Sequence, residues 1–298
     1  MPLVPLTTLL ADARAARYAV GYFEAWDGYS LEAVVEAAEA ERAPVILGFG
    51  CLLVDSAWLD NGGIEALGGL GRPVAERARI PACLLLNETH TLEQALRGLD
   101  AGFTALMMHT GRESPAGAVE KVGALVLAAH QHGVAVEGEL GSLPDATEGE
   151  IDDTHAALTD PDEAAAFVAA TGVDCLAVSF GNVHLLEGRA APVDLDRLAA
   201  VQRRVDVPLV VHGGTSFPPE AVEAAIARGV AKFNVGTVLK RTFLEGLAEA
   251  AEARTDDLGP HDLLGSHFSH DLLEAGKRRL VPVVRNLIRL YGGSGRAA

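Results

Sequence analysis

Side chains that could bind a metal or move a proton recur where apolar runs of this sequence end. They are Glu24 and Asp27 after the first run, Asn87, Glu88 and His90 in a predicted loop after the third, His109 after the fourth, Glu137 and Glu139 within the fifth, and His184 and His212 after the sixth and seventh. A single histidine in such a place is usually a core residue. Several imidazoles and carboxylates that converge predict a metal site instead, for which zinc is the best-suited ion, with positions left open for substrate.

Two glycine-rich turns add a second chemical function. HGGTS starts at His212 and NVGT starts at Asn234, and a helical pattern follows each. Glycines let backbone N–H groups approach an anion, and a helix N-terminus favours negative charge, so we favour a phosphate site over the alternative of simple tight turns. A metal site together with a phosphate-binding site indicates an enzyme that acts on a phosphorylated substrate. Such an enzyme would polarise a carbonyl or stabilise an enediolate of that substrate.

Eight short apolar runs, which alternate with amphipathic stretches, would have to position these residues. The runs span residues 18–23, 44–50, 81–86, 103–109, 133–140, 175–180, 207–212 and 231–236. Continuous apolar strands separated by helices predict a parallel sheet covered by helices, and eight such units predict an α/β fold, the (β/α)8 TIM barrel. A doubly wound open sheet is the alternative. In a barrel, the chemistry collects at the mouth where the eight strands end.

The organisation of the chain is simple. No linker or low-complexity tract divides it, so we expect one domain over residues 1–298, with a closing helix at about 262–292. The longest polar stretch, residues 142–160, follows the fifth run and is expected to be a lid or binding loop.

Charge and cysteine content limit the class of partner. The net charge of −17 argues against nucleic acid and against an anionic membrane surface. The sequence has no stretch of 18 apolar residues and no secretory signal pattern, so a membrane span is not expected. Cys51, Cys83 and Cys175 are widely spaced in or beside apolar runs, which favours buried reduced thiols and a cytoplasmic protein.

Several motifs resemble those of one known family nearly from end to end. They are VEGELG (136–141), the segment from TDPDEAA to SFGNVH (159–184), the segment from VPLVVHGGTS to AKFNVGT (207–237), and IRLYGGSGRA (288–297). The chain is thereby similar to the class II, zinc-dependent ketose-bisphosphate aldolases, which include the fructose- and tagatose-bisphosphate aldolases. This resemblance implies an aldehyde-lyase that cleaves a ketose phosphate or bisphosphate through a metal-stabilised enediolate, with a donor like dihydroxyacetone phosphate.

The resemblance also implies cofactors, partners and roles for individual residues. The cofactor would be Zn²⁺ or another divalent transition metal, with a monovalent cation as a further ion, and the assembly a homodimer or homotetramer. His184 and His212 match two zinc-binding histidines, and Glu139 matches a carboxylate near the metal. Asp145 and Glu148 are candidates for an acid/base carboxylate on the loop after strand five, with ordinary loop charge as the alternative. The residues that match the phosphate-holding segment are Gly181, Gly213, Gly214, Thr215, Asn234, Gly236 and Thr237.

The pattern breaks at the end of the third strand. The family has LDHG there, with an acid/base Asp and a zinc-binding His, whereas this chain has LNET, which puts Asn87 and Glu88 at those two positions. An amide cannot accept a proton at neutral pH, but Glu88 can still bind zinc. His109, where the family has Asp, is a further candidate ligand. His90 could bind metal or transfer a proton, and its alternative is a surface histidine.

Three functions are compatible with these departures. The first, which we favour, is a metal-dependent aldolase with altered acid/base residues and an altered substrate, which Leu185 supports because the family has glycine there, near the phosphate. The second is a phosphosugar isomerase or epimerase on the same scaffold. The third is a non-catalytic paralogue that binds a sugar phosphate or supports another subunit.

Overall fold

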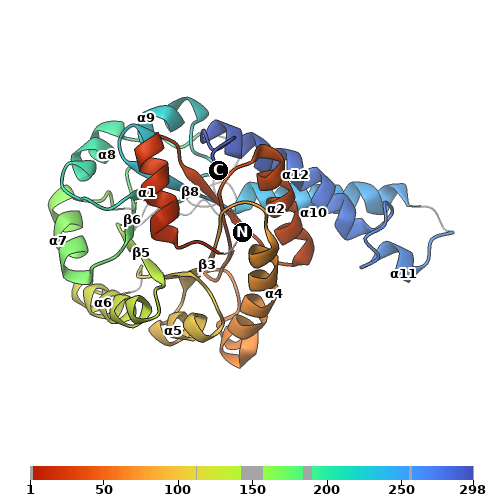
Figure 1. Cartoon of the computed structure of the whole chain (residues 1–298), viewed down its shortest axis with the longest axis horizontal. Helices are drawn as coiled ribbons and strands as arrows, with labels where there is room; N and C mark the ends of the chain where they lie inside the picture. The colour runs from red at the N-terminus through yellow and green to blue at the C-terminus, as the bar shows by residue number, and fades with distance from the viewer. Residues whose placement is uncertain (1–2, 112, 142–156, 184–189, 255–256, 298) are drawn as a thin grey trace.

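Eight parallel strands close into a barrel in sequence order, which confirms the predicted TIM barrel (Figure 1). The computed structural model describes residues 3–111, 113–141, 157–183, 190–254 and 257–297. The strands are β1 (Val20–Glu24), β2 (Val45–Gly50), β3 (Ala82–Thr89), β4 (Ala105–Met108), β5 (Ala135–Leu140), β6 (Cys175–Val178), β7 (Leu209–Val211) and β8 (Val230–Val235). Each strand lies within or close to one of the eight apolar runs, and β8 pairs with β1 to complete the closure.

β3 is the strand whose end differs from the prediction. The apolar run ends at Leu86, but the strand continues through Asn87 and Glu88 to Thr89. Gly50 of β2 pairs with Asn87, and Met108 of β4 pairs with Thr89, so pairing on both sides extends β3 beyond its apolar part. The polar side chains therefore belong to the strand and not to a loop.

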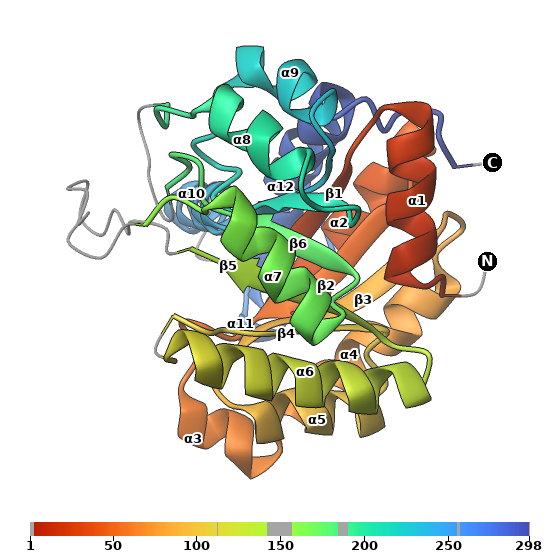
Figure 2. The ribbon, with the colours of Figure 1, turned by 90° about the vertical axis from the view of Figure 1, so that its left-hand side faces the viewer.

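Helices surround the barrel on the outside, as Figure 2 shows for α5, α6 and α7. The helical elements are α1 (Leu6–Ala16), α2 (Gly28–Glu41), α3 (Ser56–Trp58), η1 (Leu59–Gly63), α4 (Ile64–Arg77), α5 (Leu92–Asp100), α6 (Pro115–Gln131), α7 (Pro161–Thr171), α8 (Leu195–Gln202), η3 (Pro219–Ala221), α9 (Val222–Ile226), α10 (Thr237–Ala253), α11 (Pro260–Leu263) and α12 (Leu272–Leu290). Side-chain caps fix several starts: Asp27, Thr91 and Asp160 each accept a backbone N–H from the first turn.

The barrel interior forms a hydrophobic cluster separate from the one between strands and helices. Alternate strand residues face inward, among them Tyr22, Ile46 and Leu85, and α1 packs against this interior cluster. The backbone N–H of Val4 donates to the carbonyl of Ala82 at the start of β3. α1, which the sequence did not predict, therefore covers the end of the barrel where the strands begin, and Figure 1 shows it lying across that end.

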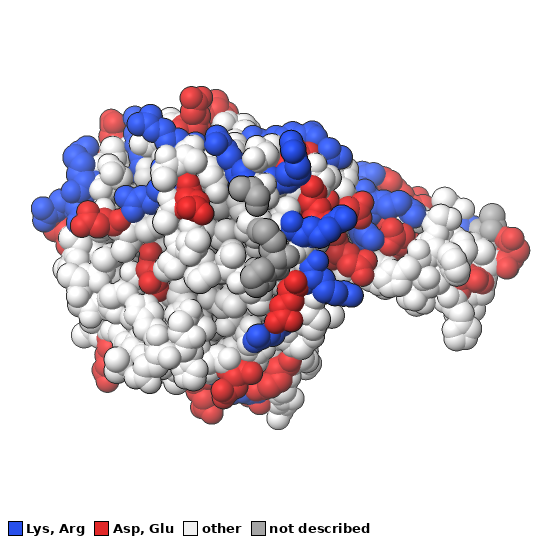
Figure 3. Space-filling model, viewed as in Figure 1, with Lys and Arg blue, Asp and Glu red and all other residues white. Residues whose placement is uncertain are grey.

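An arm built from α10, α11 and α12 projects from the barrel wall (Figure 1). The closing helix expected over residues 262–292 is two elements, because α11 ends at Leu263 and α12 begins only at Leu272. Leu244, Leu264 and Phe268 are exposed on the arm. Figure 3 shows acidic and basic side chains interspersed along the barrel edge and where the arm leaves it.

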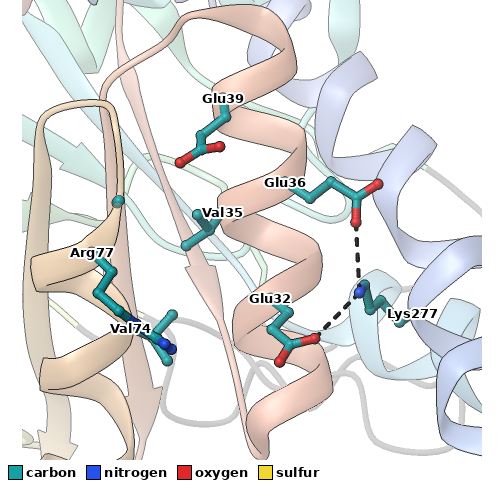
Figure 4. A pocket seen from close by; sticks show the side chains of 8 residues that line it. Glu32, Val35, Glu36, Glu39, Val74, Arg77 and Lys277 are labelled. Carbon is teal, nitrogen blue, oxygen red and sulfur yellow. Dashed lines mark hydrogen bonds and ion pairs between the residues drawn. The ribbon is translucent and has the colours of Figure 1, made fainter. Parts of the chain in front are cut away.

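A shallow groove lies on the outer surface, between α2, α4 and α12 (Figure 4). Lys277 lies in this groove and forms ion pairs with Glu32 and Glu36 of α2. These residues come from the outer helices, so the groove is separate from the ends of the strands. In the part of the chain that the structure describes, no helix is long and apolar enough to span a membrane.

Candidate active site

Strand alternation brings the polar side chains to one mouth of the barrel. Val20 and Tyr22 of β1 belong to the interior cluster, so Glu24, two residues further, faces the same way. The same alternation applies to Cys83 and Leu85 before Asn87. By this rule the inward-facing residues at the strand ends are Glu24, Gly50, Asn87, His109, Glu139, Ser179 and His212, and Asn234 joins them through its contact with the buried Lys232.

Glu88 reaches the mouth through a local break in the alternation. Its φ is +57°, in the left-handed region, and the β3–β4 register shifts between Leu86 and Thr89. A bulge of this kind re-aims side chains, and left-handed backbone costs a glutamate of order 1 kcal/mol. As a result, Glu88 lies next to Asn87, whose amide Nδ2 donates to the Glu88 carboxylate over 2.7 Å.

Glu88, Glu139 and His212 form a group whose geometry fits a metal ion. Their ligand atoms all lie within 4.8 Å of one another. His212 Nδ1 is 3.5 Å from Glu88 Oε1 and 3.4 Å from Glu139 Oε1. A tetrahedral zinc ion with bonds of about 2.1 Å separates its ligand atoms by about 3.4 Å. The spacing therefore suits ligands that share one cation, and the donor set of one imidazole and two carboxylates suits zinc or a similar divalent ion.

Glu137 fixes the orientation of the His212 ring. Its Oε1 lies 2.8 Å from His212 Nε2, which leaves Nδ1 facing Glu88 and Glu139. Burial alone would lower the pKa of His212, but the surrounding carboxylates raise it to about 10. Without a cation the site therefore holds a proton on His212, and a divalent ion could replace it. A carboxylate that orients a ligating histidine is a common feature of metal sites.

Lys232, which was not among the residues predicted from the sequence, contacts Glu137 from inside the barrel and holds it in place. Its Nζ lies 2.7 Å from Glu137 Oε2 and 2.5 Å from Asn234 Oδ1, and the Lys232 and Glu137 side chains are fully buried. Burial opposes ionisation of Glu137, but Lys232 and His212 outweigh it and lower its pKa. One signal was present in the sequence, since Lys232 is the lone charge in the eighth apolar run and carboxylates lie in the fifth.

His109 and His90 lie in different surroundings. His109 Nδ1 is 3.6 Å from Glu139 Oε2, so this histidine borders the Glu88–Glu139–His212 group. His90 Nε2 lies 3.0 Å from the backbone carbonyl of Val54, and the structure does not place His90 in that group. Three other candidates, His184, Asp145 and Glu148, lie outside the described residues.

The glycine turns lie beside this group at the ends of β7 and β8. Gly213 has a φ of +72°, and a Cβ there would lie 2.2 Å from the Val183 carbonyl oxygen, so only glycine fits without strain. Gly214 donates its N–H to the Asn234 carbonyl, which ties the two turns together. Gly181 also has positive φ, at the end of β6.

The start of α10 adjoins these turns. Thr237 is its first residue, preceded by Gly236, and Thr215 Oγ1 accepts the N–H of Val238 over 3.3 Å. Asn234 Nδ2 and Asn87 Oδ1 are buried and have no hydrogen-bond partner among the described residues. These polar atoms and the N-terminus of a 17-residue helix, whose dipole favours negative charge, would suit an anionic, hydroxylated ligand.

Comparisons with known proteins identify the family of this chain. The family described as "Fructose-bisphosphate aldolase class-II" matches residues 4–296. A fructose-bisphosphate aldolase of Thermus caldophilus is 32% identical over 99% of this chain and 100% of its own length. A sulfofructosephosphate aldolase of Alkalicoccus urumqiensis is 30% identical over 97% of this chain and 96% of its own length.

Solved structures also resemble this chain over nearly its whole length. The YdjI aldolase of Escherichia coli K12 superposes with a TM-score of 0.80 and 25% identity, over 99% of this chain and 100% of its own. A fructose-bisphosphate aldolase of Campylobacter jejuni has a TM-score of 0.77 at 18% identity, over 98% of this chain and 96% of its own, which shows the shared fold. With its barrel, its strand-end carboxylates and histidine and its full-length sequence match, the chain belongs to the class II fructose-bisphosphate aldolase family, whose members are lyases.

Proposed function

We propose that this protein is a metal-dependent carbon–carbon lyase that cleaves a ketose phosphate or bisphosphate, with a donor half like dihydroxyacetone phosphate. The observation that carries the proposal is the Glu88–Glu139–His212 group, set beside two glycine turns and the start of α10. The names of the two curated relatives support a ketose phosphate as substrate class. Asn87 and Glu88 differ from the residues of the family motif LDHG. This difference supports a substrate, or an arrangement of acid/base residues, that differs from the family's.

Glu88, Glu139 and His212 would hold the cation, with His109 at the border of the group. A bound divalent ion, zinc or a similar metal, would polarise the ketone carbonyl of the donor half. His184 remains a proposed further ligand by family resemblance. Glu137 orients His212, and Lys232 neutralises Glu137, so both residues act by positioning.

The glycine turns and α10 would hold the phosphate of the donor half. The N–H groups of Gly213 and Thr237 lie at or next to a helix start that favours negative charge, and Gly214 holds the two turns together through its bond to the Asn234 carbonyl. Asn234, held by Lys232 through its Oδ1, keeps its amide nitrogen available for a substrate oxygen. A substrate gripped in this way would keep its reacting carbons fixed relative to the metal group.

A second candidate is a phosphosugar isomerase or epimerase. The observation in its favour is Asn87, whose amide cannot accept a proton from a hydroxyl. An enzyme that only forms and reprotonates an enediolate would not need a base at that position.

We also propose a homo-oligomer assembled through the arm. Leu244, Leu264 and Phe268 are exposed there, and burying apolar side chains of this size would stabilise an interface by roughly 1.5–3 kcal/mol each. Light scattering of the purified protein would measure its mass, and Phe268→Ser should shift any oligomer towards the monomer.

Deuterium exchange at C3 of dihydroxyacetone phosphate, followed by NMR, tests the proposed donor chemistry. Metal-loaded protein should catalyse the exchange, and chelator-treated protein should not. His212→Ala should abolish metal binding and exchange while circular dichroism shows an intact barrel. His130→Ala is the matched control, because His130 lies on α6 and pairs with Asp174 outside the site.

The exchange measurements on the wild type and the two variants have three distinguishable outcomes. Exchange that depends on metal and on His212, but not on His130, supports the proposal. Full exchange in the His212→Ala variant would remove His212 from the metal site. Absence of exchange in metal-loaded protein would overturn the assignment of the donor half.

A further inference from the structure

A second carboxylate–lysine pair lies at the barrel mouth and is not part of the Glu88–Glu139–His212 group. Glu24 ends β1, and its Oε1 lies 2.5 Å from Nζ of Lys240 in the first turns of α10. The Glu24 side chain retains 18% of its exposure and the Lys240 side chain 43%. Unlike Glu137, Glu24 can therefore be reached from the mouth.

Two glycines provide the space that the Glu24 carboxylate occupies. A Cβ at Gly236 would lie 2.1 Å from Glu24 Oε2, and a Cβ at Gly50 would lie 3.0 Å from the carboxyl carbon. Both distances are shorter than a normal contact. The carboxylate thus lies where side chains of the β2 and β8 ends would otherwise be.

The position over Gly50 brings Glu24 towards Asn87. Gly50 is the direct partner of Asn87 in the β2–β3 pairing, and paired residues of parallel strands point to the same face. Adjacent strands lie about 4.8 Å apart. The charge of Glu88 also acts on Glu24: burial raises the pKa of Glu24, Lys240 opposes this shift, and Glu88 adds to it.

Aldol cleavage needs a base near the metal group. When the carbon–carbon bond breaks, the hydroxyl on the leaving half must lose its proton as it becomes a carbonyl. Among the described inward-facing carboxylates at the strand ends, Glu88 and Glu139 are assigned to the cation, and Asn87 cannot accept a proton. Glu24 is the carboxylate that remains there.

We propose that Glu24 is the catalytic acid/base that exchanges a proton with the aldol oxygen, a role that rests on the proposed lyase function. In cleavage, the hydroxyl proton moves to the Glu24 carboxylate, the electron pair of the carbon–carbon bond moves to the donor half, and the leaving half departs as an aldehyde. In condensation, Glu24 returns the proton to the newly formed alkoxide. Lys240 holds the carboxylate in place, and its positive charge favours the ionised form.

The test separates two half-reactions of the same protein. Exchange at C3 of dihydroxyacetone phosphate involves only the donor half, whereas cleavage of a ketose 1-phosphate also needs the base on the aldol oxygen. Glu24→Gln should lower cleavage about 100- to 10,000-fold and leave exchange unchanged. Glu36→Gln, in the outer groove, is the matched control and should change neither rate.

A swap variant tests the position of the carboxylate. Asn87→Asp in the Glu24→Gln background places a carboxylate on β3, next to the position that the Glu24 carboxylate occupies in the wild type. This double variant should restore part of the lost cleavage. Asn87→Asp in the otherwise unchanged chain should gain little, because a working base is already present. Rescue by the swap would not be expected if Glu24 only maintained the structure of the mouth.

The cleavage assay would use a panel of ketose 1-phosphates and bisphosphates of four to seven carbons. Wild-type cleavage that falls in Glu24→Gln without loss of exchange supports the proposal. Equal cleavage in both proteins would overturn it, as would exchange in the wild type without cleavage of any panel member. Absence of exchange in the wild type would instead mean that the lyase function itself has failed, and the role of Glu24 with it.

Discussion

Two of the described glutamate–lysine pairs have their carboxylate on a barrel strand, and these two differ in depth. Glu137 and Lys232 are 2.7 Å apart with both side chains fully buried. Glu24 and Lys240 are 2.5 Å apart at the mouth, with 18% and 43% of their side chains exposed. The inner pair can affect chemistry only through the atoms that it touches, which include His212. The outer pair can exchange contacts with substrate and water.

The difference also determines what each pair contributes to stability. Removing one partner of a buried pair leaves an uncompensated charge and typically costs about 3–5 kcal/mol, whereas an exposed pair contributes about 0–1 kcal/mol. The inner pair is therefore part of the support of the fold and the metal group. The outer pair is largely free to serve function.

The two pairs should differ most in the loss of stability that follows when the lysine of each pair is replaced. Lys232→Met should lower the free energy of unfolding by about 3–5 kcal/mol, because Glu137 would remain buried without its cation. Lys240→Met should lower it by no more than about 1 kcal/mol. Urea unfolding followed by circular dichroism measures both values. Equal effects would show that depth does not separate the two pairs.

The second prediction concerns the action of the inner pair on the metal group. Glu137→Gln removes the charge that orients His212, and should weaken zinc affinity about 10- to 100-fold. Competition with a chromophoric chelator measures the affinity. Glu24→Gln serves as the comparison and should leave zinc affinity unchanged. Unaltered affinity in Glu137→Gln would remove its positioning role.

The smallest effect is expected for Glu41, which interacts with two arginines and a serine on the outside of the barrel. Arg289, Arg285 and Ser294 lower the pKa of Glu41 to about 2, although burial opposes the shift. Glu41→Gln should lower the free energy of unfolding by about 1 kcal/mol at pH 7. Because the folded pKa is depressed, this contribution is present above the unfolded pKa of about 4.3 and is lost as the pH falls towards 2.

The measurement is the difference in unfolding free energy between the wild type and Glu41→Gln at several pH values. The difference should shrink between about pH 5 and pH 2. A difference that stays constant through that interval would show that Glu41 stabilises through packing and not through its charge.

The fold was largely predictable because every strand lies within or overlaps one of the eight mainly apolar runs. Strands that are buried on both faces, as in a TIM barrel, are mainly apolar. This pattern predicted the positions of all eight strands. α1 was missed because it precedes the first strand and follows no strand–helix unit. The gap between α11 and α12 contains Gly265 and follows the Gly259–Pro260 dipeptide, and these turn signals were not used in predicting one closing helix.

The site was predictable only in part, for two physical reasons. Glu88 depends on a left-handed backbone conformation, which is uncommon for glutamate and which no sequence pattern indicated. Lys232 and Glu137 are far apart in the sequence, and only the closed barrel brings their charges together. Residue types at strand ends indicated which side chains gather, while the distances that select metal ligands appear only in the structure.

The fit of Glu24 over Gly236 has a consequence for how this sequence can change. A side chain added at position 236 would push the Glu24 carboxylate out of its place, because its Cβ would lie 2.1 Å from Glu24 Oε2. A shorter residue at position 24 would remove this conflict, so the effect of a substitution at one position depends on the residue at the other. Positions 24 and 236 therefore form an epistatic pair, and a mutational scan of one should give different results depending on the residue at the other.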